Sequence, residues 1–186
     1  GSAVSGLLAS GLGRKKSLFL AGCLFFVSAL GSMEPEFLVF SHGEPSFSLM
    51  IMFNIYRIIG GVGVGLASAI CPMYIGEVSP SNIRGMLVSW NQFAIIFGQL
   101  LVYFINFLIL GSNANPVLDL VNGTYQIMNP EASAWTVATG WRYMFGSEAV
   151  PAGLFALLIC LVPESPRYLV MTGRDDAATR ILTRIN

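Results

Sequence analysis

Four polar side chains stand inside long apolar runs of this sequence, and these are the residues whose types and spacing could do chemistry. They are Arg57, Glu148, Gln92 and Gln99. A charged group inside a membrane-spanning helix costs roughly 2.5–3.5 kcal/mol even on insertion scales, so it normally faces a partner or a water-filled cavity. Each of these positions therefore needs either a structural or a functional explanation.

Arg57 would lie about 12 Å into its span, counted from Leu49 at 1.5 Å per residue. From that depth the side chain could not easily extend to bulk water. It could form a purely structural ion pair between helices, or it could face a water-filled cavity and pair with a buried acid. The neighbouring spans 17–32 and 85–110 contain no suitable acid. We therefore expect the partner to stand on a helix that precedes residue 1.

Glu148 is the carboxylate inside the apolar run that follows Trp141, about 10 Å along a helix from that residue. In so apolar a setting it could take up and release a proton near neutral pH. It could equally stay protonated and hydrogen-bonded. The sequence leaves both interpretations open.

Gln92 and Gln99 are seven residues apart, so on a helix they fall about 20° from one another and about 10 Å apart along the axis. Ile95, Tyr103 and Asn106 lie near the same line. Amides offer both a donor and an acceptor, which suits a neutral polyol such as a sugar. The same stripe could instead join packed helices by hydrogen bonds.

The elements that carry these residues must be membrane helices. The chain has 186 residues, of which 54% are hydrophobic and 11% charged, whereas soluble domains average about 25% charged residues. Mean hydropathy is +0.68. A net charge of zero gives no reason to expect nucleic acid as a partner. We predict an all-α membrane protein embedded in a lipid bilayer.

Helix and connector signals divide the chain into ten segments. We predict the end of a membrane helix at 1–12, a basic loop at 13–16, a span at 17–32, an outer loop at 33–48, a span at 49–76, a cytoplasmic turn at 77–84, a span at 85–110, a long outer loop at 111–140, a span at 141–162, and a cytoplasmic segment with an amphipathic helix at 163–186.

Charge sorts the connectors in the same way. Eight of the ten basic residues lie in 14–16, 77–84 and 163–186, and none lies in 33–48 or 111–140. Basic connectors stay in the cytoplasm, so the alternation supports the predicted topology. Gly61 and Gly65, four residues apart, predict a face for close helix pairing.

Other classes of site find little support in the sequence. Cys23, Cys71 and Cys160 are widely spaced in apolar runs and are best interpreted as buried free thiols. No nucleophile–base pair and no metal-ligand spacing is visible, so we expect no enzyme activity, no cofactor and no metal.

Several motifs resemble the sugar porters of the major facilitator superfamily, in the order in which that family carries them. Gly13-Arg14-Lys15 resembles the turn between helices two and three, Arg57–Gly65 resembles the fourth helix, and Pro72–Pro80 with Ile83-Arg84-Gly85 resembles the turn that follows it. Asn91–Gln99 resembles the fifth helix, and Gly140–Phe145 resembles the start of the sixth. Pro163-Glu164-Ser165-Pro166-Arg167 resembles the motif that ends the first half of the transporter. The region around Gln92 and Gln99 is most similar to bacterial D-xylose–proton symporters.

The resemblance implies roles for individual positions. Gln92, Ile95 and Gln99 match residues that contact the sugar, Arg57 matches an arginine that pairs with a proton-carrying aspartate on the first helix, and Glu148 matches a buried acid near that pair. Arg14, Glu77, Arg84, Glu164 and Arg167 match a cytoplasmic charge network that latches the two six-helix halves. Ser10 and Gly11 depart from the family pattern of an acid followed by a basic residue, so we expect a weaker latch or an acid supplied from elsewhere.

We therefore expect a fragment running from the end of helix two through helix six of a twelve-helix transporter, located in a cell membrane and by resemblance a bacterial inner membrane. The implied function is proton-coupled symport of D-xylose or a related monosaccharide by alternating access. Its partners would be the sugar, protons, lipid and the C-terminal half of the same transporter. A facilitative hexose uniporter, a transporter-like nutrient sensor and a helical scaffold with no ligand remain alternatives.

Overall fold

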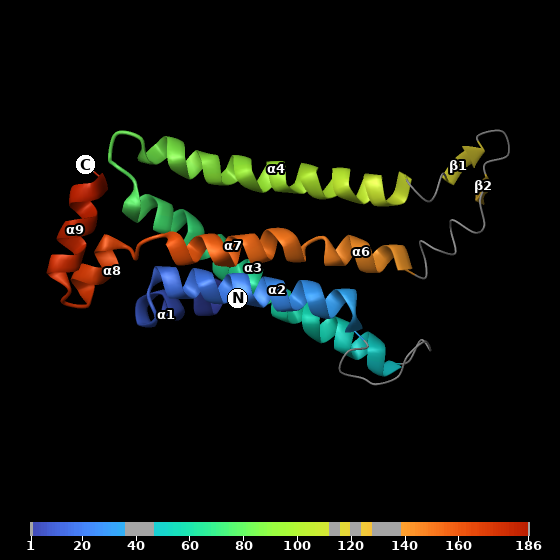
Figure 1. Ribbon diagram of the computed structural model, residues 1–186, viewed down its shortest axis with the longest axis horizontal. Helices are drawn as coiled ribbons and strands as arrows, with labels where there is room; N and C mark the ends of the chain where they lie inside the picture. Colours follow the sequence, from blue (N-terminus) through green and yellow to red (C-terminus); the bar gives the residue numbers. More distant parts are fainter. Residues whose placement is uncertain (1, 36–46, 112–115, 120–123, 128–138, 186) are drawn as a thin grey trace.

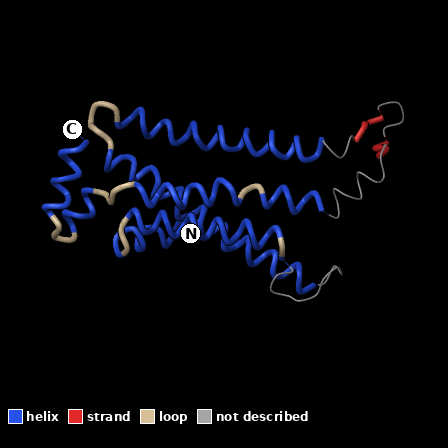
Figure 2. Tube along the Cα trace, in the orientation of Figure 1, coloured by secondary structure: helices blue, strands red, loops and turns tan. Residues whose placement is uncertain are grey.

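The computed structural model describes residues 2–35, 47–111, 116–119, 124–127 and 139–185. These residues are almost entirely helical (Figures 1 and 2). In chain order the elements are α1 (Ser2–Gly11), α2 (Arg14–Met33), α3 (Phe47–Val78), α4 (Arg84–Gly111), β1 (Pro116–Asp119), β2 (Thr124–Ile127), α6 (Trp141–Gly146), α7 (Ala149–Leu161), α8 (Pro166–Met171) and α9 (Asp175–Ile185).

Within the described residues, four helical stretches are long and apolar enough to cross a membrane. They are Arg14–Met33, Phe47–Val78, Arg84–Ile109 and Trp141–Leu161. The fold is therefore that of a helical membrane protein, as the composition predicts. Between α4 and α6, β1 and β2 form a small antiparallel strand pair in which Pro116 faces Ile127 and Asp119 faces Thr124.

The core lies where α2, α3 and α7 pack together, while α4 runs along one side of this group (Figure 1). Six residues are buried there: Ala9, Leu18, Ala21, Leu66, Ile70 and Ile159. Antiparallel packing gathers the starts of α2 and α4, the ends of α3 and α7, and both α8 and α9 at one end of the molecule (Figure 1). The predicted cytoplasmic connectors therefore share that end.

Small residues allow close approach between these helices, but on a different face of α3 from the one we predicted. Gly60 and Gly63 are buried against α2, where Gly60 faces Ser28 and Gly63 faces the backbone of Ala21. Gly61 is exposed and has open space where a side chain would be. We predicted a pairing face from Gly61 and Gly65, whereas within the described chain the helical repeat of 3.6 residues turns Gly60 and Gly63 toward α2.

The basic cluster after Gly13 belongs to a helix, so the prediction of a loop at 13–16 was wrong. Gly13 has a φ of +93°, a conformation that favours glycine, and α2 begins directly after it. The carboxylate of Glu164 accepts a hydrogen bond from the Lys15 amide at 3.0 Å. This acceptor satisfies a donor at the start of α2 and offsets the cost of basic side chains there.

Two further boundaries differ from the predicted spans. Glu77 lies in the last turn of α3 rather than in the connector, because the helix continues to Val78. The predicted span 141–162 is divided near Ser147 into α6 and α7. Pro151 has no amide hydrogen and therefore cannot bond the carbonyl of Ser147, which accounts for the interruption.

Candidate functional site

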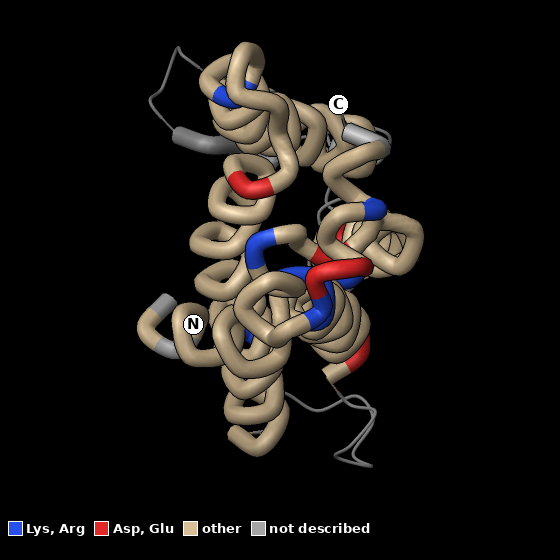
Figure 3. Tube along the Cα trace, turned by 90° about the vertical axis from the view of Figure 1, so that its left-hand side faces the viewer, with Lys and Arg blue, Asp and Glu red and all other residues tan. Residues whose placement is uncertain are grey.

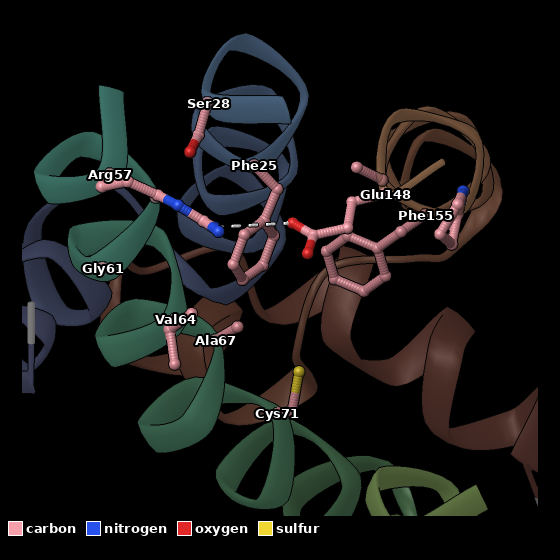
Figure 4. Close-up of a pocket in the computed structure, with 12 residues that line it drawn as sticks. Phe25, Ser28, Arg57, Gly61, Val64, Ala67, Cys71, Glu148 and Phe155 are labelled. Atoms are coloured by element: carbon pink, nitrogen blue, oxygen red, sulfur yellow. Dashed lines mark ion pairs between the residues drawn. The ribbon is translucent and has the colours of Figure 1, made fainter. Parts of the chain in front are cut away.

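A cavity of about 570 Å³ lies between α2, α3 and the α6–α7 region, within the membrane-spanning part of the chain. Arg57 projects into it from α3, and Glu148 projects into it from the residue that precedes α7 (Figure 4). Phe25, Phe155 and Cys71 line the same space. Two charged side chains therefore meet in a largely apolar cavity.

Arg57 and Glu148 point toward one another, with 3.9 Å between Nη1 and Oε2 (Figure 4). The distance is longer than the 2.7–2.9 Å of a charge-assisted hydrogen bond. The side chains are 40% and 46% exposed, so they are open to the cavity. We expected the acid partner of Arg57 to lie outside this chain, but Glu148 occupies that position among the described residues. The structural reason is that the packing of α3 against the α6–α7 region brings together two residues that are far apart in sequence.

Aromatic rings surround the same guanidinium group. The Arg57 Cζ atom lies 4.1 Å from the centroid of Phe145 and 5.6 Å from that of Phe53. Phe53, Trp141 and Phe145 contact one another edge to face, with centroids 5.5–6.3 Å apart. We call these three residues the aromatic cluster. Arg57 is therefore contacted by one carboxylate and by two aromatic rings.

The residues predicted to contact a sugar lie elsewhere, on α4. Gln92, Ile95 and Gln99 are all exposed, and no described residue of α4 lines the Arg57 cavity. Within the described chain, neither amide makes a hydrogen bond to a neighbouring helix. The structure therefore does not support the interpretation that the stripe joins helices of this chain to one another. The predicted sugar contacts and the Arg57–Glu148 pair form two separate groups.

The residues predicted to form a charge network stand at the start of α2 and α4, the end of α3, and in and before α8, which lie at one end of the molecule (Figure 1). Figure 3 views the molecule from this end, with its basic residues in blue and its acidic residues in red. Arg14 binds Glu77 in a bidentate pair, with distances of 3.0 Å from Nε and 2.9 Å from Nη2. Both side chains are less than 10% exposed. The hydroxyl of Ser165 also donates to Glu77. Ser10 and Gly11 depart from the family pattern of an acid followed by a basic residue. The acid that pairs with Arg14 is Glu77, on α3.

Glu164 joins this group through the backbone. Its Oε1 atom accepts hydrogen bonds from the amides of Lys15 and Ser165, at 3.0 and 3.1 Å. Two other bonds reinforce the same end: the Tyr74 hydroxyl donates to the Pro163 carbonyl at 2.7 Å, and the Tyr168 hydroxyl donates to that of Gly11 at 3.2 Å. Glu164 therefore connects α2 to the segment after α7.

Arg84 and Arg167 are not brought into this network by the structure. Arg84 donates to the carbonyl of Ser79 at 3.4 Å, next to its own helix. Arg167 is exposed on α8, and within the described part of the chain it makes no ion pair. Two of the five predicted members, Arg84 and Arg167, are therefore exposed at the surface of the described chain.

Sequence reasoning missed one contributor to the Arg57–Glu148 pair and one to the Arg14–Glu77 pair. The ring of Phe145 and the hydroxyl of Ser165 contact Arg57 and Glu77, respectively. The chain contains 13 phenylalanines and many serines, so residue type alone does not distinguish these two. The signal that could have found Phe145 is its position three residues before Glu148, which is one helical turn.

Comparison with known proteins gives the family. The sequence model for the family described as "Sugar (and other) transporter" matches residues 1–186. The chain belongs to this family. It is 45% identical to a D-xylose–proton symporter of Escherichia coli, covering 100% of this chain and 35% of the relative. It is 38% identical to an arabinose–proton symporter of Bacillus subtilis, covering 100% and 34%. The predicted family is therefore confirmed.

Solved structures of this sugar-transporter family agree with the observed fold. The xylose transporter of E. coli in a partially occluded inward-open conformation superimposes with a TM-score of 0.83 at 45% identity, covering 99% of this chain and 40% of that chain. A proton:xylose symporter of the major facilitator superfamily bound to 6-bromo-6-deoxy-D-glucose gives 0.80 at 43% identity, covering 99% and 36%. The fold is therefore that of part of a major facilitator transporter. The chain spans about a third of the length of the curated relatives it matches.

Proposed function

We propose that this chain is part of a sugar transporter that carries D-xylose or a related monosaccharide across a cell membrane together with a proton. The single observation that carries the proposal is the Arg57–Glu148 pair in a cavity within the spans. Ionisable residues at membrane depth are costly and are typical of ion pathways. The relatives named as xylose–proton and arabinose–proton symporters supply the substrate class.

In this proposal Arg57 and Glu148 serve proton coupling. When Glu148 is ionised, the two charges balance. When it takes a proton from water, the carboxyl becomes neutral and Arg57 keeps its positive charge. The change in charge alters what the cavity can bind, which is the form of coupling that alternating access requires.

Sugar recognition is assigned to α4. The amides of Gln92 and Gln99 can each donate and accept hydrogen bonds, and Ile95 between them offers an apolar contact to a sugar ring. All three side chains are exposed in the described chain and so are free to contact a ligand or another part of the transporter.

We assign gating to the charged residues at the end of the molecule that contains α8 and α9. We propose that Arg14, Glu77 and Glu164 form the stable part of a cytoplasmic latch, and that Arg84 and Arg167, which are exposed, complete it by contacts outside this chain. We further propose a multi-pass location in the bacterial inner membrane.

The test is transport by the full-length protein in proteoliposomes. Uptake of labelled D-xylose is measured with and without an inward proton gradient, and labelled glucose and arabinose serve as competitors. We expect accumulation above equilibrium only with the gradient. Equilibration without accumulation would indicate a facilitative uniporter, and no sugar movement at all would contradict transport.

Replacing Glu148 tests the coupling residue directly. Glu148→Gln keeps the shape of the side chain but removes its titration. We expect the variant to exchange sugar across the membrane in counterflow and to lose gradient-driven accumulation. Accumulation at the wild-type level would remove Glu148 from the coupling mechanism.

A further inference from the structure

We propose that Phe145 is a positioning residue whose ring face keeps the Arg57 guanidinium in place while Glu148 carries a proton. This inference rests on the proposed function, because it gives the ring a part in proton coupling. It concerns a residue that has no charge and no polar group.

The geometry of the pair leads to this inference. The Arg57 Cζ atom lies 4.1 Å from the Phe145 centroid, well within the roughly 6 Å range of a cation–π contact. The Arg57 Nη1 to Glu148 Oε2 distance, in contrast, is 3.9 Å, beyond a direct hydrogen bond. The ring contact therefore lies well inside the range of a cation–π interaction, whereas the carboxylate lies at the limit of ion pairing.

The two contacts respond differently to a proton. Attraction to the carboxylate is lost when Glu148 becomes neutral, whereas the ring quadrupole does not titrate. On protonation the charge of the pair changes from zero to +1, and an unpaired cation in an apolar cavity is costly. A fixed ring face lowers that cost in the protonated state.

Neighbouring rings hold Phe145 itself in position. Phe53 and Trp141 pack against it in T-shaped contacts, at centroid distances of 5.5 and 6.3 Å. Phe53 also contacts Arg57 at 5.6 Å. Edge-to-face contacts of this kind fix ring orientation, so the face presented to the guanidinium is preorganised.

The other ionisable groups around the pair do not offer a substitute partner. Among the described residues, α2 lines the cavity with Phe25 and Ser28, α3 contributes the Cys71 thiol, and the α6–α7 region contributes Glu148. Arg142 on α6 lies over the Trp141 ring at 5.1 Å and carries the same charge as Arg57. Once Glu148 is neutral, the attractive contacts that remain for Arg57 among the described residues are the rings of Phe145 at 4.1 Å and Phe53 at 5.6 Å, of which Phe145 is the nearer.

The experiment compares Phe145→Leu, which removes the quadrupole, with Phe145→Tyr, which keeps it. Phe26→Leu is the matched control, because Phe26 lies on α2 and, among the described residues, the rings that contact Arg57 are those of Phe53 and Phe145. Sugar counterflow by the full-length protein in proteoliposomes is measured across acidic to alkaline pH. We expect Phe145→Leu to lose about fivefold in counterflow at acidic pH relative to wild type and little at alkaline pH. Phe145→Tyr should restore the wild-type profile, and Phe26→Leu should keep it.

An equal loss of counterflow for Phe145→Leu at every pH would overturn the proposal, because it would show that the ring contributes only packing. A pH-dependent loss of the same size in Phe26→Leu would also overturn it.

A second measurement is independent of transport: nuclear magnetic resonance of labelled arginine, with the Arg57 signal assigned by Arg57→Gln. We expect a ring-current shift that persists through protonation in wild type and is absent in Phe145→Leu. If wild type moves no sugar, the proposed function fails, and this shift alone then decides whether Phe145 holds the cation.

Discussion

Gln92 is the residue at which a ligand contact and a packing contact can be separated by measurement. Its side chain is exposed on α4, so replacing it removes little packing within this chain. We expect Gln92→Ala to weaken D-xylose binding about 2- to 10-fold, the net value of one hydrogen bond. Binding is measured by calorimetry on the purified full-length protein, and melting temperature is measured in parallel.

Ser89→Ala is the control, because the Ser89 hydroxyl donates to the Gly85 carbonyl of its own helix at 3.0 Å. This variant should retain both sugar affinity and melting temperature. A parallel loss of affinity and stability in Gln92→Ala would assign the amide to helix packing instead.

At the residue scale, the sequence predicts charged and amide residues better than it predicts their partners. Arg57, Glu148 and Gln92 stand out because polar groups in apolar spans are costly. The contact between Arg57 and Glu148 depends on tertiary packing between α3 and the α6–α7 region, so no spacing along the chain could reveal it. Phe145 is different, because its position one helical turn before Glu148 could have suggested a place near the pair, although residue type alone does not distinguish it among 13 phenylalanines.

The buried pair between α2 and α3 leads to a prediction at the scale of elements. Arg14 and Glu77 are 8% and 7% exposed and joined by two hydrogen bonds. Removing one partner leaves the other charge buried and unpaired, which costs about 3–5 kcal/mol. We expect Arg14→Ala to lower the melting temperature of the purified protein strongly.

Arg180→Ala provides the comparison, because Arg180 is exposed on α9 and has no ion pair among the described residues. Surface charges of this kind contribute about 0–1 kcal/mol, so the melting temperature should scarcely change. A similar small effect in Arg14→Ala would mean that the Arg14–Glu77 pair does not join the two helices.

Close packing of α2 on α7 gives a second prediction for the elements. A Cβ atom at Gly22 would lie 3.1 Å from the Cβ and 3.2 Å from the Cα of Ala156, and a backbone atom cannot move aside alone. We expect Gly22→Ala to destabilise the protein by about 1–3 kcal/mol, the usual cost of overpacking. Gly61→Ala, in open space, should be neutral or slightly stabilising in the same thermal denaturation assay.

Element types could be predicted well and element ends poorly. Long apolar runs gave the spans, because length and composition suffice for that. The start of α2 at Arg14 was missed, since the acceptor for its first amides comes from Glu164, far along the chain. The interruption before α7 was missed although Pro151 was visible, because a proline can be accommodated within a helix, as Pro72 is in α3.

The whole molecule has a sidedness that labelling can test. The end with Arg14, α8 and α9 should face the cytoplasm, and the end with β1 and β2 should face outward. We expect Asp119→Cys to react with a membrane-impermeant maleimide in intact cells and Asp175→Cys to react only after the membrane is opened. Cys160 is already exposed, contrary to our expectation of a buried thiol, so Cys160→Ser serves as the background.

The interruption between α6 and α7 has a mechanical consequence for the same molecule. Phe145 belongs to α6, whereas Glu148 begins the segment that continues as α7, so the two contacts of Arg57 lie on opposite sides of the joint. Pro151 deprives that joint of one backbone hydrogen bond. Bending at this joint would move the Phe145 ring away from the Glu148 carboxylate. The two contacts of Arg57 would therefore depend on the angle between α6 and α7.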